Sequence, residues 1–497
     1  MSGRSLGRRW GATAAAGAVL LAGCTSATPA AAPTTHAPTV SASSPTASSD
    51  GASGFTPGAA TSDDRLFPEL GNGGYDVNHY AITISYAPGT HAISGSDVVT
   101  ATATQGLSRF DLDLRSLTVS SVTVDGHAAA YARSGDKLVV TPAAGIRRGT
   151  SFITVVTYAG VPKIYSDPTL GTEGFQTYGT QEAIAQGEPQ GAATWFAVND
   201  YPGDKATYDI TVTAPSADAA LSNGVLVSQK ASSGGTTTWH WAESKPMASY
   251  LAFVAIGNYR VHTSTHNGLP VVTAVDAALP TSVDAVIART PEIVDFLATQ
   301  FGPYPFDAEG GIVQTDPTIN FALENQTRPV YSSLFFRGPA SADESGVVAH
   351  ELAHQWYGDS VSLEQWSDIW LNEGFATYAE WLWTQHEGGA SPLQTFTDWY
   401  QRGKLTTEAP GVRTRSNVFD NAPYDRGAAT LEALRISVGD SAFFRIIKAW
   451  AAQREYGNGT TDQFIALAEQ ISGKQLGPLF TAWLDTPGRP AFPQPLS

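Results

Sequence analysis

Cysteine is almost absent from this chain, and its absence rules out two classes of site. Among 497 residues, Cys24 is the single cysteine. One cysteine alone forms no internal disulfide and no zinc site built from thiolates. A metal site in this protein must therefore use histidine nitrogens and carboxylate oxygens as ligands.

Positive charge is also scarce. The chain has 29 Lys and Arg residues against 46 Asp and Glu residues, a formal net charge of −17. Binding to nucleic acid depends on clustered positive charge, so this composition argues against a nucleic-acid partner. The acidic balance is compatible with cationic ligands. The length, the 42% of hydrophobic residues and the 12 Trp predict two or three well-packed domains.

The apolar run near the N-terminus is too short to span a bilayer. It covers Ala12 to Leu21, follows a basic stretch, and ends in Leu21-Ala22-Gly23-Cys24, which resembles the lipobox of bacterial lipoproteins. We therefore expect residues 1–23 to be a signal peptide and Cys24 to become the lipidated first residue. The protein would then be exported and held on the extracytoplasmic side of the cell membrane. An ordinary secretory signal with a chance cysteine is the alternative.

Composition and periodicity divide the remaining chain into three parts. Residues 24–65 are mostly Ser, Thr, Ala, Pro and Gly, which bury too little apolar surface to fold and predict a disordered tether. Residues 66–262 show short alternating strands between turn residues and predict an antiparallel β domain. Residues 263–497 predict a mixed α and β domain, with helices expected over Ser282–Gln300 and Glu373–His386 among others.

Two histidines four residues apart carry the clearest chemical signal. Within a helix expected over Val347–Tyr357, the sequence His350-Glu351-Leu352-Ala353-His354 places both imidazoles on one face, where they can bind one zinc ion. Glu373, 19 positions after His354, is expected to be the third ligand, which leaves a fourth position open. Glu351 is expected to be the general base toward the metal-bound water. The alternative is a buried helix whose histidines bond to backbone carbonyls.

With Asn372-Glu373 following the His-Glu-x-x-His sequence, the chain resembles the aminopeptidase N family of zinc metallopeptidases from about residue 75 to 485. The resemblance implies an α+β multidomain fold, in which a β-saddle domain precedes a thermolysin-like mixed α/β catalytic domain. It implies one zinc ion and an enzyme that hydrolyses N-terminal residues from peptides through zinc-activated water. The chain stops just after the catalytic domain, so it looks like a short, two-domain member.

Three further segments resemble motifs of this family and imply roles for single residues. Phe321-Ala322-Leu323-Glu324-Asn325 resembles the exopeptidase motif, whose Glu binds the free α-ammonium of the substrate. The segment beginning at Glu188 resembles the stretch where the β domain lends an acid to the same task. Tyr424-Asp425-Arg426-Gly427 resembles the segment whose Tyr donates a hydrogen bond to the oxyanion. The alternatives are loop acids for Glu324 and Glu188 and a packing role for Tyr424.

Several assignments stay open. Asp368 and Glu380 bracket Glu373, and either is a candidate partner for the second ring nitrogen of a metal histidine.

The expected binding partners of the protein are peptides with a free N-terminus and the membrane, through a lipid on Cys24. Three other functions remain: a zinc endopeptidase of N-blocked peptides, an epoxide hydrolase resembling the leukotriene-hydrolysing relatives, and a non-catalytic surface binding protein on a metallopeptidase fold.

Overall fold

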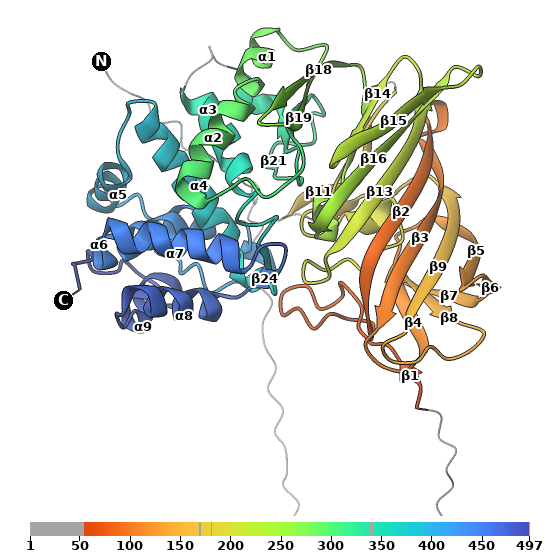
Figure 1. The fold of residues 1–497 in the computed structure, drawn as a ribbon, viewed down its shortest axis with the longest axis horizontal. Helices are drawn as coiled ribbons and strands as arrows, with labels where there is room; N and C mark the ends of the chain where they lie inside the picture. Colours follow the sequence, from red (N-terminus) through yellow and green to blue (C-terminus); the bar gives the residue numbers. More distant parts are fainter. Residues whose placement is uncertain (1–53, 168–169, 180, 338–341, 497) are drawn as a thin grey trace, which may run out of the picture.

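The computed structural model describes residues 54–496, apart from positions 168–169, 180 and 338–341. The predicted signal peptide, Cys24 and the first part of the predicted tether lie outside these residues. A β-rich half and a helix-rich half lie side by side (Figure 1). This confirms the predicted order of a β domain followed by a mixed α/β domain.

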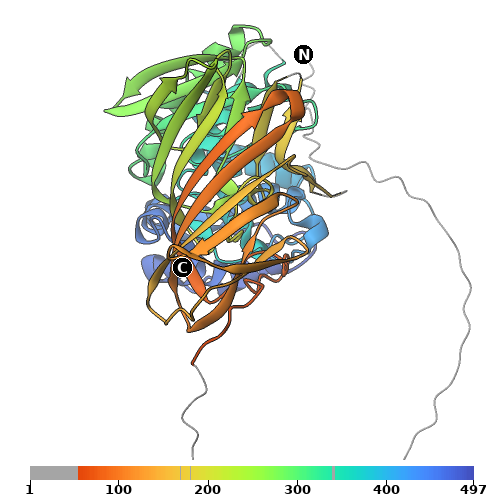
Figure 2. The ribbon, with the colours of Figure 1, turned by 90° about the vertical axis from the view of Figure 1, so that its right-hand side faces the viewer.

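The largest sheet of the β-rich half has eight strands, and its long strands face the viewer in Figure 2. In β2, alternate side chains such as Tyr80, Ile82 and Ile84 are buried, whereas those between them are more exposed. This period of two gives the sheet one face toward the core. In spatial order the strands are β15 (Val225–Ala231), β16 (Thr236–Met247), β13 (Ala206–Pro215), β2 (Tyr75–Ala87), β3 (Ala92–Ala103), β9 (Ser151–Gly160), β5 (Thr118–Val124) and β6 (His127–Ala128).

One pair in this sheet departs from the predicted antiparallel arrangement. β13 and β2 run parallel, with Tyr208 opposite Tyr80, while the other neighbours in the sheet are antiparallel. The prediction is therefore wrong for this pair. Parallel neighbours need a long connection, which the chain between these two strands provides.

Two smaller sheets complete the β-rich half. One of them contains β12, which ends at Gln186, two residues before Glu188. The four-stranded sheet has the order β1 (Thr56–Pro57), β4 (Leu107–Asp113), β8 (Lys137–Thr141) and β7 (Ala130–Ser134). The five-stranded sheet has the order β10 (Tyr165–Asp167), β11 (Gly171–Tyr178), β12 (Glu182–Gln186), β17 (Val254–Gly257) and β14 (Ala219–Ser222).

The described residues include the last part of the segment predicted to be a tether. β1 pairs with β4, with Thr56 opposite Leu107. The buried carboxylate of Asp64 accepts a hydrogen bond of 2.9 Å from the backbone N–H of Trp366, in the helix-rich half. The prediction is wrong for residues 56–65, because backbone pairing and one buried carboxylate hold a polar segment that has no apolar periodicity.

The helix-rich half is built on a five-stranded sheet with the order β18 (Tyr259–His266), β19 (Leu269–Asp276), β20 (Glu309–Gln314), β22 (Val330–Ser332) and β21 (Ala322–Leu323). β19, β20 and β22 are parallel, and a short pair joins β23 (Ser362–Leu363) to β24 (Asn458–Gly459). The α-helices are α1 (Ser282–Ile287), α2 (Thr290–Phe301), α3 (Ala342–Ala353), α4 (Trp370–His386), α5 (Pro392–Gln401), α6 (Gly427–Val438), α7 (Asp440–Gln453), α8 (Thr461–Ser472) and α9 (Gly477–Phe480).

The helix predicted over Ser282–Gln300 is two helices. α1 ends at Ile287, and α2 begins at Thr290 with Pro291 in its first turn. Proline has no N–H and a fixed φ, so it starts a helix and does not continue one. Among the described residues, the helices are all too short or too polar to cross a membrane.

Hydrogen bonds to backbone carbonyls join the two halves next to the His-Glu-x-x-His segment. The ammonium of Lys205 donates to the carbonyls of Asp359 at 2.7 Å and Ser360 at 3.0 Å. The hydroxyl of Tyr201 donates to the carbonyl of Glu364 at 2.7 Å. These donors anchor the end of the connection between β12 and β13, which also carries Glu188, to the helix-rich half.

Candidate metal centre

Two adjoining helices bring the predicted metal ligands together. α3 carries His350 and ends at Ala353, earlier than the helix predicted to reach Tyr357, so His354 lies just past its end. α4 begins one turn before Glu373. One oxygen of Glu373 lies 3.2 Å from Nε2 of His350 and 3.5 Å from Nε2 of His354. All three side chains are buried, and their ligand atoms lie within 4.8 Å of one another.

The hydrogen-bond partners of the two Nδ1 nitrogens of these histidines show that the cluster fits a cation. Nδ1 of His350 lies 2.7 Å from a carboxylate oxygen of Glu380, and Nδ1 of His354 lies 3.0 Å from the carbonyl of Tyr357. Such partners fix each ring with Nε2 turned toward the third ligand. Two imidazole nitrogens and one carboxylate are the donor set of a catalytic zinc site with one open position. His350, His354 and Glu373 therefore form a zinc site.

These contacts also decide between the two bracketing acids. Glu380 is the partner of His350, whereas Asp368 accepts a hydrogen bond of 2.6 Å from Thr461. The carbonyl of Tyr357 was not among the sequence predictions, because a backbone acceptor in a turn leaves no residue pattern.

Glu351 lies beside these three ligands and belongs to a second group of possible metal ligands, which shares His354. Its carboxylate, one nitrogen of His354 and the carboxylate of Glu324 lie within 4.8 Å of one another. Burial raises the pKa of Glu351 to about 7, against the lowering influence of His350 and His354. A carboxylate with a pKa near neutrality suits a group that accepts and returns a proton.

Tyr424 lies next to His350, in a π-helical turn, η7 (Ala422–Arg426), that precedes α6. Its ring lies parallel to that of His350, with an interplanar angle of 16° and 6.1 Å between centroids. Burial raises its pKa well above the ordinary value, and neighbouring carboxylates, Glu373 first, raise it further. The phenol therefore stays neutral and keeps its proton for donation.

Two glycines set the distance between Glu373 and Tyr424. A Cβ added at Gly374 would lie 3.0 Å from Cα of Gly427, and one at Gly427 would lie 2.9 Å from Cα of Gly374. The backbones of α4 and the Tyr424 turn therefore meet without room for a side chain, one residue from the metal ligand. Gly427 ends the Tyr424 motif and Gly374 directly follows Glu373, but their contact depends on tertiary packing and leaves no local signal.

The two predicted ammonium-binding acids lie close to the zinc ligands, with Glu324 buried and Glu188 half-buried. Glu324 follows β21 and accepts a hydrogen bond of 3.2 Å from the hydroxyl of Tyr250, a residue of the β-rich half that the sequence did not suggest. Oε1 of Glu188 is buried and has no hydrogen-bond partner among the described residues. Burial raises the pKa of Glu188, and the charges of Glu324, Glu373 and Glu351 raise it further.

The combined charge of these acids calls for cations. When ionised, Glu188, Glu324, Glu351 and Glu373 place four negative charges close together, three of them on buried side chains, and uncompensated buried charges are costly. A dication and one ammonium group would offset three of them. The arrangement therefore suits a zinc ion together with a ligand that carries a single positive charge.

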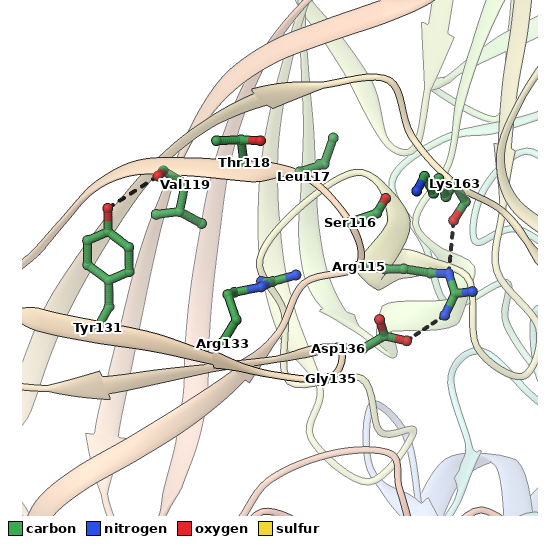
Figure 3. Close-up of a pocket in the computed structure, with 10 residues that line it drawn as sticks. All are labelled: Arg115, Ser116, Leu117, Thr118, Val119, Tyr131, Arg133, Gly135, Asp136 and Lys163. Carbon is green, nitrogen blue, oxygen red and sulfur yellow. Dashed lines mark hydrogen bonds and ion pairs between the residues drawn. The ribbon is translucent and has the colours of Figure 1, made fainter.

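A cavity of about 590 Å³ in the β-rich half lies apart from this cluster (Figure 3). Its charged groups are partly paired with one another: Arg115 lies 2.5 Å from Asp136 and donates at 3.1 Å to the carbonyl of Lys163. None of its ten lining residues is a predicted site residue. The chemistry-bearing side chains thus gather at the zinc cluster.

Comparison with known proteins gives the following matches. Residues 76–251 match the peptidase M1 N-terminal domain, and residues 289–483 match the peptidase family M1 domain. Aminopeptidase N of Streptomyces lividans is 28% identical over 412 residues, which is 76% of this chain and 46% of that protein. Aminopeptidase M1-D of Oryza sativa subsp. japonica is 28% identical over 333 residues, which is 62% of this chain and 38% of that protein. The chain spans less than half of the length of these relatives.

Solved structures of similar size match over most of the chain. The M1 zinc metallopeptidase from Deinococcus radiodurans shares 29% identity at a TM-score of 0.79, covering 88% of this chain and 99% of that one. A mutant of it bound to a Tyr-Ser-Ala substrate shares 29% identity at a TM-score of 0.80, with 88% and 100% coverage.

Proposed function

The chain belongs to peptidase family M1, and from that membership we propose that it is a zinc aminopeptidase that removes N-terminal residues from peptides. The observation that carries the proposal is the placement of Glu324 and Glu188 beside the zinc ligands. Glu324 is buried and Glu188 is half-buried, and the buried Oε1 of Glu188 has no hydrogen-bond partner in the described part of the chain. A free α-ammonium would supply both the charge and the donors that these carboxylates lack.

The reaction follows from the positions of the chain's own groups. Zinc held by His350, His354 and Glu373 would polarise a carbonyl and lower the pKa of water. Glu351 takes a proton from the attacking water and returns it to the leaving amine. Tyr424 donates a hydrogen bond to the oxygen on which negative charge develops.

Exopeptidase behaviour follows from the ammonium site. Tyr250 fixes one oxygen of Glu324, and Glu188 approaches from the β-rich half, so that both acids face the zinc cluster. A substrate anchored there by its amine presents the first peptide bond to the zinc and to Glu351. The Deinococcus enzyme was solved with a tripeptide, Tyr-Ser-Ala. Short peptides with a free N-terminus are accordingly the substrates proposed for this chain.

The competing functions fit these observations less well. An N-blocked peptide has no positive charge to offer Glu324 and Glu188, so an endopeptidase would leave the buried carboxylate of Glu324 and the half-buried one of Glu188 uncompensated. A non-catalytic binding protein has no need of a complete ligand set, a base and an oxyanion donor around one point. Nothing in the geometry favours an epoxide over a peptide.

We expect Glu324→Gln to reduce kcat/KM for an aminoacyl amide by about 10- to 100-fold, because a hydrogen bond to a charged group contributes about 1.5–3 kcal/mol. The inhibition constant of an N-acetylated dipeptide, which forms no ion pair, should stay the same. Steady-state kinetics measures both quantities.

Asp368→Asn is the matched control, since it makes the same change at a carboxylate that bonds to Thr461 and faces away from the cluster. It should leave kcat/KM near the wild-type value. Equal losses of affinity for free and acetylated ligands in Glu324→Gln would contradict the ammonium-binding role.

We propose further that Cys24 carries a lipid and holds the enzyme at the outer side of the membrane. The tetrapeptide Leu21-Ala22-Gly23-Cys24 at the end of a short apolar run supports this. In cells that process lipoproteins, Cys24→Ser should move the protein from the membrane fraction to the soluble fraction, as seen by immunoblot. A wild-type protein found only in the soluble fraction would rule the anchor out.

A further inference from the structure

We propose that Arg426 is a positioning residue for Tyr424: its buried guanidinium clamps the π-helical turn that carries Tyr424 to the C-terminal segment of the chain. The inference rests on the oxyanion role proposed above for Tyr424. It assigns a task to a residue that touches neither the zinc ligands nor the substrate acids.

The contacts of Arg426 are unusual for a buried cation. Its side chain is fully buried, and in the described part of the chain no carboxylate forms an ion pair with it; the nearby acids Glu408 and Asp420 pair with Arg413 instead. Its three side-chain nitrogens instead donate to carbonyl oxygens of two separate segments. The acceptors are the carbonyls of Trp483 (2.8 Å), Ala482 (2.9 Å), Thr486 (2.7 Å), Gly488 (2.8 Å), Glu408 (3.0 Å) and Thr407 (3.3 Å).

These acceptors explain how the charge is tolerated. Ala482 and Trp483 belong to a second π-helical turn, η8 (Thr481–Asp485), and Thr486 follows its end. Carbonyl groups at a helix C-terminus carry partial negative charge and stabilise a cation. Burial lowers the pKa of Arg426 to about 10, which leaves it charged at neutral pH. The guanidinium therefore ties three backbone segments together by hydrogen bonds alone.

The turn that Arg426 clamps has π-helical hydrogen bonding, which is rare. In η7 the backbone N–H of Gly427 bonds to the carbonyl of Ala422, five residues back, and such π turns occur mostly as single insertions at functional sites. Relaxation to an ordinary α-helical turn would shift the register by one residue, a rotation of about 100° about the helix axis. That rotation would turn Tyr424 away from His350. Arg426 on one side and the Gly374–Gly427 contact on the other hold the turn in its present form.

Lysine cannot reproduce this clamp. Its ammonium offers three donors at one point, whereas the planar guanidinium offers five in a fixed fork. Arg426→Lys keeps the charge and most of the volume, so it is the gentlest change that breaks the geometry. The zinc ligands and the ammonium site have no contact with Arg426, so zinc content and KM should stay near their wild-type values.

The test is a double-mutant cycle on the zinc-loaded full chain, in which kcat and KM are measured for wild type, Arg426→Lys, Tyr424→Phe and the double variant. We expect Arg426→Lys to lower kcat by about 10- to 100-fold, since a displacement of about 1 Å of a catalytic group costs about 10²-fold. In the Tyr424→Phe background, the same change should cause no further loss.

Two further variants separate positioning from general instability. Arg328→Lys is the matched control, because Arg328 is also fully buried and donates to the carbonyls of Ser222 and Gly224, in the β-rich half. Its effect on kcat should be independent of Tyr424→Phe. Gly427→Ala displaces the same turn from its other side and should, like Arg426→Lys, show no further loss once Tyr424 is replaced.

Each contrary outcome has a distinct meaning. Equal losses from Arg426→Lys in both backgrounds, or a wild-type kcat in Arg426→Lys, would overturn this inference while leaving the proposed function intact. A wild-type kcat in Tyr424→Phe would overturn the role of Tyr424 and the inference together.

Discussion

Glu351→Gln is expected to keep its zinc and to lose about 10³-fold in kcat, within the range of about 10²- to 10⁴-fold that a positioned general base contributes. Glutamine has nearly the shape of glutamate but accepts no proton under these conditions. We propose zinc at His350, His354 and Glu373, whose ligand atoms converge, and not at the second group of possible ligands, which Glu351 forms with Glu324 and His354. The loss should therefore fall on kcat, with KM changed little.

Two measurements make this result decisive. Zinc content per chain, determined by elemental analysis, must equal that of wild type, so that loss of metal is excluded as the cause. A free-amine inhibitor must bind with wild-type affinity, so that collapse of the neighbouring Glu324 site is excluded as well. Near-wild-type turnover in a zinc-replete Glu351→Gln sample would remove Glu351 as the base.

Removal of the metal should abolish activity altogether. The oxygen of Glu373 that lies 3.2 Å from His350 and 3.5 Å from His354 is the acidic member of the donor set. Although burial alone would raise its pKa, the charges of His354 and His350 lower the pKa of Glu373 to about 2, so it is ionised and ready to bind a cation. Glu373→Ala should neither retain stoichiometric zinc nor hydrolyse any aminoacyl amide. A chelator should have the same effect on wild type, and added zinc should reverse it.

The chain contains its own control for this prediction. Glu292, His386 and Glu387 form an exposed group of possible metal ligands, and both of these acids already pair with Arg289. His386→Ala should therefore leave zinc content and activity unchanged. Full activity in a chelated, zinc-free wild-type sample would contradict the metal-dependent mechanism.

Local periodicity predicted the features that depend on one element. The spacing of His350 and His354 places them one helical turn apart, and the alternation in β2 gave its buried face. The role of Glu380 was equally predictable from the sequence. Glu380 lies seven residues after Glu373, two turns along the same helix face, whereas Asp368 precedes the first residue of α4. The helical periodicity of the sequence therefore favours Glu380 over Asp368 as the partner of His350.

Features that depend on distant parts of the chain carried no such signal. The parallel pairing of β13 with β2 is set by the order of strands in the sheet, and the sequence of neither strand predicts it. Tyr250 reaches Glu324 from the other half of the molecule and stands in no recognisable motif. The Gly374–Gly427 contact and the carbonyl cage around Arg426 exist only once the helices are packed. Such residues set the geometry of the site, while the motifs supply its reactive groups.

The most direct test of the central claim compares matched substrates on the zinc-loaded protein. Hydrolysis of a series of aminoacyl chromogenic amides would be measured beside that of their N-acetyl counterparts, with and without a chelator. We expect chelator-sensitive cleavage of the free-amine substrates and no cleavage of the acetylated ones, because only a free ammonium can satisfy Glu324 and Glu188. Cleavage of acetylated substrates at comparable rates would contradict the account and indicate an endopeptidase.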